Sequence, residues 1–378
     1  MPAPDADAGF VVAAVREPGT SADARVREAA GGVRSWPRVL RLAVEHGVVQ
    51  YVRSSLIRCA VVPPGGIDLA LRDAELADVA TTLMLDAELE RVLGVLGSRS
   101  IDTLVLKGPV LARSLYPQRF LRPYRDVDVC VHDADLDRAA DALVGSGFRE
   151  IAYEAEVARL AFTAAGSQGR FHRMFVDADG RALIELHSDP LQLGLPPAAE
   201  DDRWRRAIPA PELGQGAMTL GDDDQLLHLC VHAHKHGFSR LMWLKDLDLI
   251  LRTKGTAIDW RLVEDAARRE GVRASIWYAL SLTSAILGTP LPAAAVAMAP
   301  WLPIRFLYRR VWPAERVAGL SAGMRRRAVQ FHVAESWSGM LPTLVLMGRR
   351  RDRARLLLRS LRHRSTGTQP SSHERRTG

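Results

Sequence analysis

The sequence predicts an α+β fold in which a small mixed β-sheet is flanked by helical regions. Apolar residues recur at helical spacing before residue 100 and again after residue 220, whereas short runs of branched residues bounded by turn signals lie between them. Of the 378 residues, 47% are hydrophobic and 25% are charged, which is the usual composition of a globular protein. This composition argues against a disordered or fibrous protein.

These patterns divide the chain into five parts. Residues 1–34 are rich in Ala, Gly and Asp without a sustained period and are expected to form a loose leader. Residues 35–100 are expected to form an N-terminal helical region, residues 101–190 the sheet core, and residues 191–345 a C-terminal helical region. Residues 346–378 are expected to form a basic, flexible tail.

The core is expected to alternate strands and helices. Lys107-Gly108 stops the first strand, and Pro109 suits the first turn of a helix because its missing N–H is not needed there. The predicted elements are strand 103–106, a helix beginning at Pro109, strand 126–131, helix 136–144, and a hairpin with arms 171–176 and 182–187.

Net charge is concentrated at one end of the chain. The total is +7, but after Gly348 ten Arg oppose only Asp352 and Glu374, so the tail carries +8 and the body −1. The high isoelectric point therefore gives no reason to call the whole protein a nucleic-acid binder. The tail interleaves Leu with Arg, so a peripheral contact with an anionic membrane, RNA or an acidic partner is the alternative to a solvated tail. It has no aromatic residue for base stacking.

Cysteine usage and hydropathy favour a cytoplasmic protein. The three cysteines are far apart and form no CxxC pair, which argues against a disulfide framework or a cysteine zinc site. The N-terminus lacks a basic region followed by an apolar stretch, so no secretion signal is expected. The uncharged run 275–304 is interrupted by Gly and Pro. It predicts a buried helix ending near Leu287-Gly288, and no transmembrane segment.

Two aspartates stand out in the second predicted strand. Asp126 and Asp128 are separated by one residue, so they point to the same face with Cα atoms about 6.6 Å apart. Such a pair can share Mg²⁺, and a two-metal site can stabilise both the attacking and the leaving oxygen in phosphoryl transfer. Asp-X-Asp also occurs on solvated edge strands. The branched neighbours favour a buried strand, where two negative charges would need a cation.

Lys107-Gly108 is the second feature with possible chemistry. A glycine between a strand and a helix leaves room for backbone N–H groups to meet phosphate oxygens, and the adjacent lysine adds a cation. The alternative is a simple chain turn with a solvated lysine.

Glu185 is an acidic residue inside an apolar strand. If that strand neighbours the one with Asp126 and Asp128, three carboxylates converge, and Glu185 can ligate a metal or accept the proton of an attacking hydroxyl. The alternative is a partly exposed strand face on which Glu185 and His187 meet water.

The order of these motifs resembles a known family. It runs Leu106-Lys107-Gly108, Leu115-Tyr116-Pro117, Arg122, Asp126-Val127-Asp128, Gly147-Phe148 and Ile184-Glu185-Leu186-His187. In this order, and in its later His232, His236, Trp243-Leu244 and Asp246, the chain is similar to the largely uncharacterised bacterial nucleotidyltransferases of the DNA polymerase β superfamily. The likeness covers most of residues 35 to 300.

The resemblance implies roles for these residues. Asp126 and Asp128 would be metal ligands, Glu185 the third acidic residue, and Lys107 and Gly108 would border the triphosphate. The wider superfamily has Gly followed by Ser or Gly in this turn, whereas Pro109 follows Gly108 here. Because Pro109 cannot donate a hydrogen bond, phosphate contact must shift to Gly108 or Lys107.

The reaction implied is transfer of a nucleoside monophosphate from a nucleoside triphosphate. An acceptor nucleophile would attack the α-phosphorus and pyrophosphate would leave, with Mg²⁺, or Mn²⁺ as a substitute, in a site for one or two ions. Arg122 and Arg125 are further candidates for nucleotide binding. The acceptor stays open between a small molecule, a peptide, a protein side chain and RNA. The alternatives are a catalytically silent relative that binds a nucleotide or partner, and an RNA or membrane adaptor acting through the tail.

His228, His232 and His236 recur every fourth residue and share one helical face. One metal ion would reach only an adjacent pair, because the three span more than two turns. His232 and His236 either line the nucleotide or acceptor pocket or are hydrogen-bonded core histidines. Asp246, on the next helix, is a candidate to orient one of them.

Overall fold

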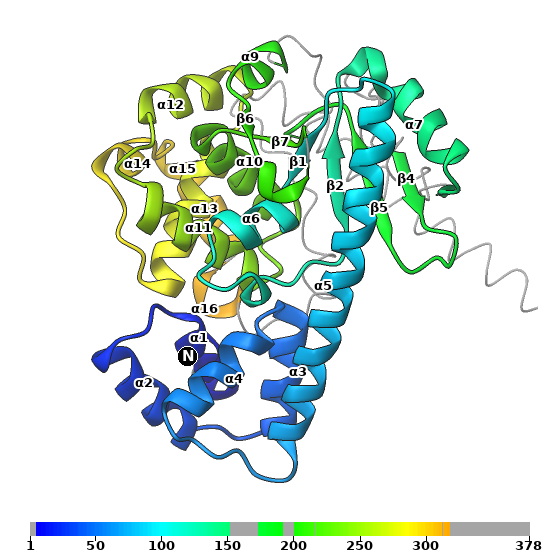
Figure 1. Cartoon of the computed structure of the whole chain (residues 1–378). Coiled ribbons are helices and arrows are strands. Elements are labelled where there is room, and N and C mark those ends of the chain that lie inside the picture. The colour runs from blue at the N-terminus through cyan, green and yellow to red at the C-terminus, as the bar shows by residue number, and fades with distance from the viewer. Residues whose placement is uncertain (1–4, 152–172, 192–199, 215, 312, 318–378) are drawn as a thin grey trace, which may run out of the picture.

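A seven-stranded mixed sheet forms the centre of the computed structural model, which describes residues 5–151, 173–191, 200–214, 216–311 and 313–317. The strands are β1 (Leu104–Leu106), β2 (Val127–Cys130), β3 (Arg149–Ile151), β4 (Arg173–Val176), β5 (Leu183–His187), β6 (Ile208–Pro209) and β7 (Met218–Thr219). Their order is β3-β4-β5-β2-β1-β7-β6. The pairs β2–β5 and β1–β7 are parallel and the others are antiparallel. The predicted α+β fold is confirmed (Figure 1).

The four predicted strands correspond to β1, β2, β4 and β5. The hairpin turn between β4 and β5 is fixed by Asp177, whose Oδ1 accepts from the backbone N–H groups of Arg181 and Ala182. Strands β3, β6 and β7 were not predicted, because each has two or three residues and none is a run of apolar residues like Leu-Val-Leu in β1. Since β6 and β7 lie in residues 208–219, the sheet extends beyond the predicted core boundary at residue 190.

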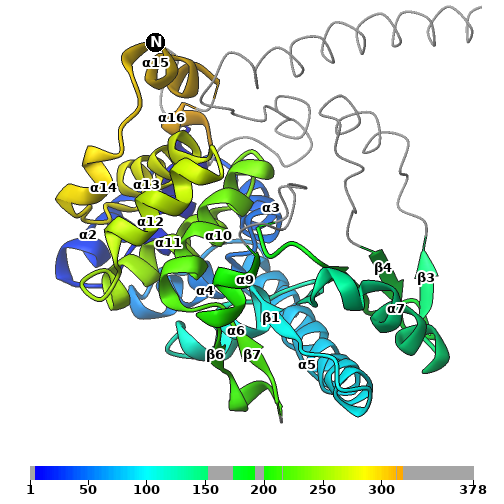
Figure 2. The same cartoon turned by 90° about the horizontal axis from the view of Figure 1, so that it is seen from above.

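The two faces of the sheet differ in chemistry. Val127, Val129 and Ile184 point into an apolar layer with α5 (Ile67–Ser98) and α7 (Leu136–Gly145). The alternate positions, including Asp128, face the other way. Figure 2 shows the C-terminal helices on the side of β1 away from α7. The acidic residues therefore point away from the apolar layer.

The first helices contradict the predicted loose leader over residues 1–34. Residues 6–31 form α1 (Ala6–Val15) and α2 (Thr20–Gly31). Phe10 and Val11 are fully buried, and the Phe10 ring packs edge-on against Trp36 at 5.3 Å between centroids. Helix α1 is apolar on nearly every side because it is surrounded by α2, α3, α4 and α13. It therefore lacks the amphipathic period that the prediction relied on.

The predicted N-terminal helices are present with one interruption. Gly47 adopts a left-handed conformation (φ 69°) and divides the expected helical stretch into α3 (Trp36–His46) and α4 (Val49–Arg58). Glycine tolerates this backbone conformation without a Cβ clash. Helix α5 then runs from the N-terminal helices along the sheet (Figure 1).

The C-terminal region is helical as predicted. Its helices are α9 (Glu200–Arg205), α10 (Asp222–Lys235), α11 (Leu241–Lys254), α12 (Trp260–Arg269), α13 (Arg273–Leu287), α14 (Ala293–Ala297), α15 (Leu302–Val311) and α16 (Ala314–Val317). Helix α13 ends at Gly288 in a left-handed conformation, as expected. Within the described ranges, no helix is long and apolar enough to cross a membrane. The predicted basic tail lies outside the described residues.

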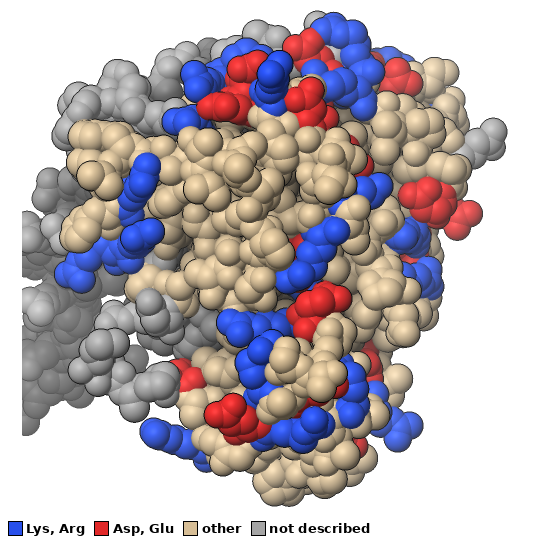
Figure 3. Space-filling model, turned by 90° about the vertical axis from the view of Figure 1, so that its left-hand side faces the viewer, with Lys and Arg blue, Asp and Glu red and all other residues tan. Residues whose placement is uncertain are grey.

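The face seen in Figure 3 has an uncharged middle, with basic and acidic side chains intermixed above and below it. Among the described residues, α14 and α15 and the segment between them expose the apolar side chains of Val296, Trp301, Leu302 and Phe306. Charges of the two signs are not sorted into separate areas at the top and bottom of this face.

Candidate active site

The pairing of β2 with β5 brings the acidic residues together. Asp128 is the direct parallel partner of Glu185 in the register of the two strands. Asp126 immediately precedes β2 and shares the face of Asp128. One ligand atom each from Asp128, Glu185 and His187 lie within 4.8 Å of one another. The expectation that the Glu185 strand neighbours the Asp128 strand is confirmed.

His187 belongs to this cluster although sequence reasoning did not select it. Its Nε2 lies 3.0 Å from Asp128 Oδ1 and 3.5 Å from Glu185 Oε2, and its side chain is buried. Burial alone would lower the pKa of His187, but hydrogen bonds to both carboxylates raise it. His187 therefore does not simply meet water. The signal that could have found it is its spacing, two residues from Glu185 on the same strand face.

Lys107 is a buried cation at the end of β1. Its Nζ lies 2.7 Å from Asp128 Oδ1 and 3.4 Å from His232 Nδ1, and only 7% of the residue is exposed. Burial would lower the pKa of Lys107, but Asp128 and then Asp126 raise it. The alternative of a solvated lysine is therefore wrong.

The backbone of Lys107 departs from the strand to make this contact possible. Leu106 pairs with Asp128, so a continued strand would turn the next side chain toward Val105 and the apolar layer. Lys107 instead has φ 50° and ψ −117°, an unusual conformation for a residue with a Cβ. Such a conformation costs roughly 1–3 kcal/mol and is found mainly at functional sites.

Gly108 begins α6 (Gly108–Ser114) and is required by packing. A Cβ at this position would lie 2.8 Å from Tyr124 Cβ and 2.9 Å from Tyr124 Cγ. The Tyr124 hydroxyl in turn donates to Asp86 on α5. The glycine thus lets β1 and α6 approach Tyr124 closely. The contact of Gly108 with phosphate stays a prediction.

The two aspartates differ in their electrostatic environment. Burial and then the neighbouring Asp128 raise the pKa of Asp126 to about 6. Burial would also raise the pKa of Asp128, but Lys107 and His187 hold it well below its usual range. Asp128 is therefore ionised, and its charge is balanced by Lys107 and His187. For Asp126, the charges of Lys107 and Arg122 do not outweigh burial and the charge of Asp128. An added cation would therefore stabilise the ionised form of Asp126 more than that of Asp128.

Arg122 and Arg125, predicted to bind nucleotide, occupy different environments. Arg122 is buried and donates to both oxygens of Asp246 at 3.1 and 2.9 Å. The Tyr116 hydroxyl also donates to Asp246, at 2.6 Å. Arg125 is about half exposed and pairs with Asp78 at 2.6 Å. The carboxylate of Asp246 thus orients Arg122 rather than a histidine of α10, and Arg125 lies near the N-terminal helices.

His232 lies beside Lys107 in a cluster of rings, whereas His228 is a core residue. The Nδ1 atom of His228 lies 2.5 Å from the Pro190 carbonyl oxygen. The ring of His232 lies 4.6 Å from His236 and 5.0 Å from Trp243, measured between centroids. Burial and then Lys107 lower the pKa of His232 well below its usual value. His232 is thus a neutral ring at the site, while the more exposed His236 lies farther out.

Lys235 is a second cation that sequence reasoning missed. It is three residues after His232 and therefore on the same side of α10. Its side chain keeps contact with solvent, yet surrounding protein atoms and then Lys107 lower its pKa to about 8, against the opposing charges of Glu185 and Asp128. In the sequence Lys235 lies between His234 and His236, and nothing in this local pattern indicates that it is near the carboxylates.

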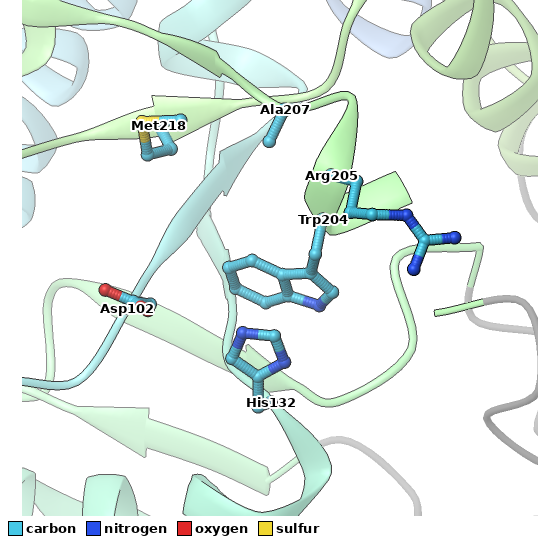
Figure 4. Close-up of a pocket in the computed structure, with 6 residues that line it drawn as sticks. All are labelled: Asp102, His132, Trp204, Arg205, Ala207 and Met218. Atoms are coloured by element: carbon cyan, nitrogen blue, oxygen red, sulfur yellow. The ribbon is translucent and has the colours of Figure 1, made fainter. Parts of the chain in front are cut away.

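A separate cavity of about 460 Å³ lies beyond the other end of β2. Figure 4 shows its lining residues, Asp102, His132, Trp204, Arg205, Ala207 and Met218. The rings of His132 and Trp204 stack at 3.8 Å between centroids. None of the predicted site residues lines this cavity, which is therefore distinct from the carboxylate cluster.

Residues 33–288 match the model of a family described as uncharacterised nucleotidyltransferases. The chain belongs to this family. The matched region runs from just before α3 through α13 and contains every predicted site residue. No curated protein matches the chain in sequence. Membership supports nucleotidyl transfer in general, without naming the nucleotide or the acceptor.

The pKa of Asp126 leads to a pH-dependent prediction for the metal-free protein. Below pH 3.8 the carboxyl is protonated in both the folded and unfolded states, whereas between about pH 4 and 6 only the folded state retains the proton. Ionised Asp126 therefore destabilises the folded protein increasingly as pH rises. Because Asn mimics the protonated form, the stability gained by Asp126→Asn should grow from pH 4 to 6 and then level off. Urea unfolding of both proteins in EDTA measures this difference, and a gain that is equal at every pH would contradict it.

Proposed function

We propose that this protein is a divalent-metal-dependent nucleotidyltransferase, which transfers a nucleoside monophosphate from a nucleoside triphosphate to an acceptor and releases pyrophosphate. The observation that carries the proposal is the register pair Asp128–Glu185, with Asp126 on the same face, in a chain of the nucleotidyltransferase family. Converging carboxylates on a rigid sheet are suited to hold a cation against phosphate oxygens.

The side chains present fit a divalent cation. Asp126, Asp128 and Glu185 would supply the oxygen ligands that Mg²⁺ prefers, and His187 adds a nitrogen that Mn²⁺ also accepts. A bound cation would offset the negative charge that develops on the phosphate oxygens during transfer. Without it, the charges of Lys107 and Arg122 do not outweigh the effects of burial and Asp128 on the partly buried Asp126, and its pKa stays raised.

Glu185 suits the role of ligand better than that of general base. Burial would raise its pKa, but the hydrogen bond with His187 outweighs this and the pKa is lowered. A general base works best with a pKa near the working pH, whereas a ligand must be ionised. We therefore assign Glu185 to cation binding, held in place by His187.

The lysines would bind the triphosphate from two sides. Lys107 lies at the turn before α6, and Lys235 on α10 is close enough to Glu185 and Asp128 for their charges to raise its pKa. Gly108 can offer its backbone N–H, while Pro109 cannot. Arg122 contributes a fixed positive charge near Asp126, because Asp246 and Tyr116 hold it in one orientation. The rings of His232 and His236 would border the nucleotide or the acceptor.

The decisive test is loss of transfer when Asp128 is neutralised. Asp128→Asn should lower nucleotidyl transfer by about 10²- to 10³-fold or more, since the main cation ligand and the partner of Lys107 are weakened together. Purified protein is incubated with Mg²⁺ and each labelled nucleoside triphosphate, with metabolites, peptides and RNA as acceptors. Mass spectrometry then detects the gain of one nucleoside monophosphate.

The matched control is Asp141→Asn, which changes an exposed aspartate on α7 and should leave transfer unchanged. If Asp128→Asn retains full activity, the enzymatic proposal is wrong. Absence of any mass gain with the wild-type protein, together with nucleotide binding, would indicate a catalytically silent relative.

Lys235 should contribute mainly to nucleotide binding. Lys235→Gln removes one cation facing the phosphates, which should raise the KM for the nucleoside triphosphate about tenfold with a smaller change in kcat. Lys235→Arg should keep most of the affinity. Lys254→Gln is the control, because Lys254 pairs with Asp222 at 3.4 Å and takes no part in the carboxylate cluster. Equal KM values for Lys235→Gln and Lys254→Gln would show that Lys235 does not contribute to nucleotide binding.

A further inference from the structure

One oxygen of Asp128 is already engaged twice. Its Oδ1 lies 2.7 Å from Lys107 Nζ and 3.0 Å from His187 Nε2. Both distances are those of hydrogen bonds to a charged acceptor. In a site where two metal ions lie about 4 Å apart, a bridging carboxylate gives one oxygen to each ion. With Oδ1 engaged by Lys107 and His187, only Oδ2 of Asp128 remains for a metal ion.

Lys107 is built into this position. The side chains of Lys107 and Asp128 are 8% and 2% exposed, so separating them would leave two buried charges without partners. The backbone of Lys107 adopts its unusual positive φ at the residue that would otherwise turn away from Asp128. A flexible surface lysine would need neither the burial nor the strained backbone. The ammonium is therefore a fixed part of the site.

We propose that this site binds one divalent cation and that the Lys107 ammonium fills the position of a second. The inference rests on the proposed function and sharpens it: the triphosphate would be held between one metal ion and one lysine. The lysine keeps its single charge whatever metal is present.

The test counts bound Mn²⁺ instead of measuring activity. Wild-type protein is saturated with a non-hydrolysable nucleoside triphosphate analogue, and protein-bound Mn²⁺ is measured by equilibrium dialysis and electron paramagnetic resonance. We expect one Mn²⁺ per chain. Lys107→Met should bind two, because removing the ammonium leaves His187 as the one remaining neighbour of Asp128 Oδ1 given above and adds one negative charge to the site. Lys254→Met is the control and should bind one.

Each outcome separates the inference from the proposed function. Two Mn²⁺ in the wild-type complex would overturn the inference and leave the proposed function intact. One Mn²⁺ in both wild type and Lys107→Met would also overturn it. No bound Mn²⁺ and no bound nucleotide would contradict the proposed function itself. If Lys107→Met does not fold, as judged by circular dichroism, Lys107→Gln replaces it, and the wild-type count alone still decides between one ion and two.

Discussion

The ion pair between Lys107 and Asp128 is the interaction on which the organisation of the site depends. It joins the end of β1 to the middle of β2, and Asp128 is in turn the register partner of Glu185 on β5. Three strands are thus connected through one carboxylate. The pair is buried, so each charge needs the other: a buried ion left without its partner typically costs 3–5 kcal/mol. The unusual backbone of Lys107 follows from placing that ammonium beside the sheet, and the next residue, Gly108, closely approaches Tyr124.

Helices on the open side of the sheet complete the environment. Helix α10 places His232 beside Lys107, and α11 supplies Asp246, which holds Arg122. These contacts link the sheet to the C-terminal helices by charged and polar groups that have little access to water. In such surroundings charges interact more strongly than in water. The helices therefore shape the electrostatics of the carboxylates as well as covering them.

The sequence predicts four of the seven strands and the acidic residues because their patterns are local. Asp126 and Asp128 alternate within one strand, and the hairpin leading to Glu185 has a recognisable turn. It missed what depends on residues meeting across the fold. His187 has no local signal other than spacing, the contact of Lys107 requires a departure from the strand, and Lys235 is related to the carboxylates only through the packing of α10. The leader was misread for a related reason, since a helix buried on nearly every side, as α1 is, shows no amphipathic period. The partners of Arg122 likewise come from α11 and could not be read from its neighbours in sequence.

We propose that the face shared by β2 and β5 is the cation and nucleotide site. The most direct measurement is a crystal structure with Mn²⁺ and a non-hydrolysable nucleoside triphosphate analogue, using anomalous scattering to locate manganese. We predict one peak within ligand distance of Asp128 Oδ2 and Glu185, with Lys107 still on Asp128 Oδ1 and the triphosphate between the metal and Lys107. A manganese peak or a bound nucleotide elsewhere, for example in the His132–Trp204 cavity, would contradict it.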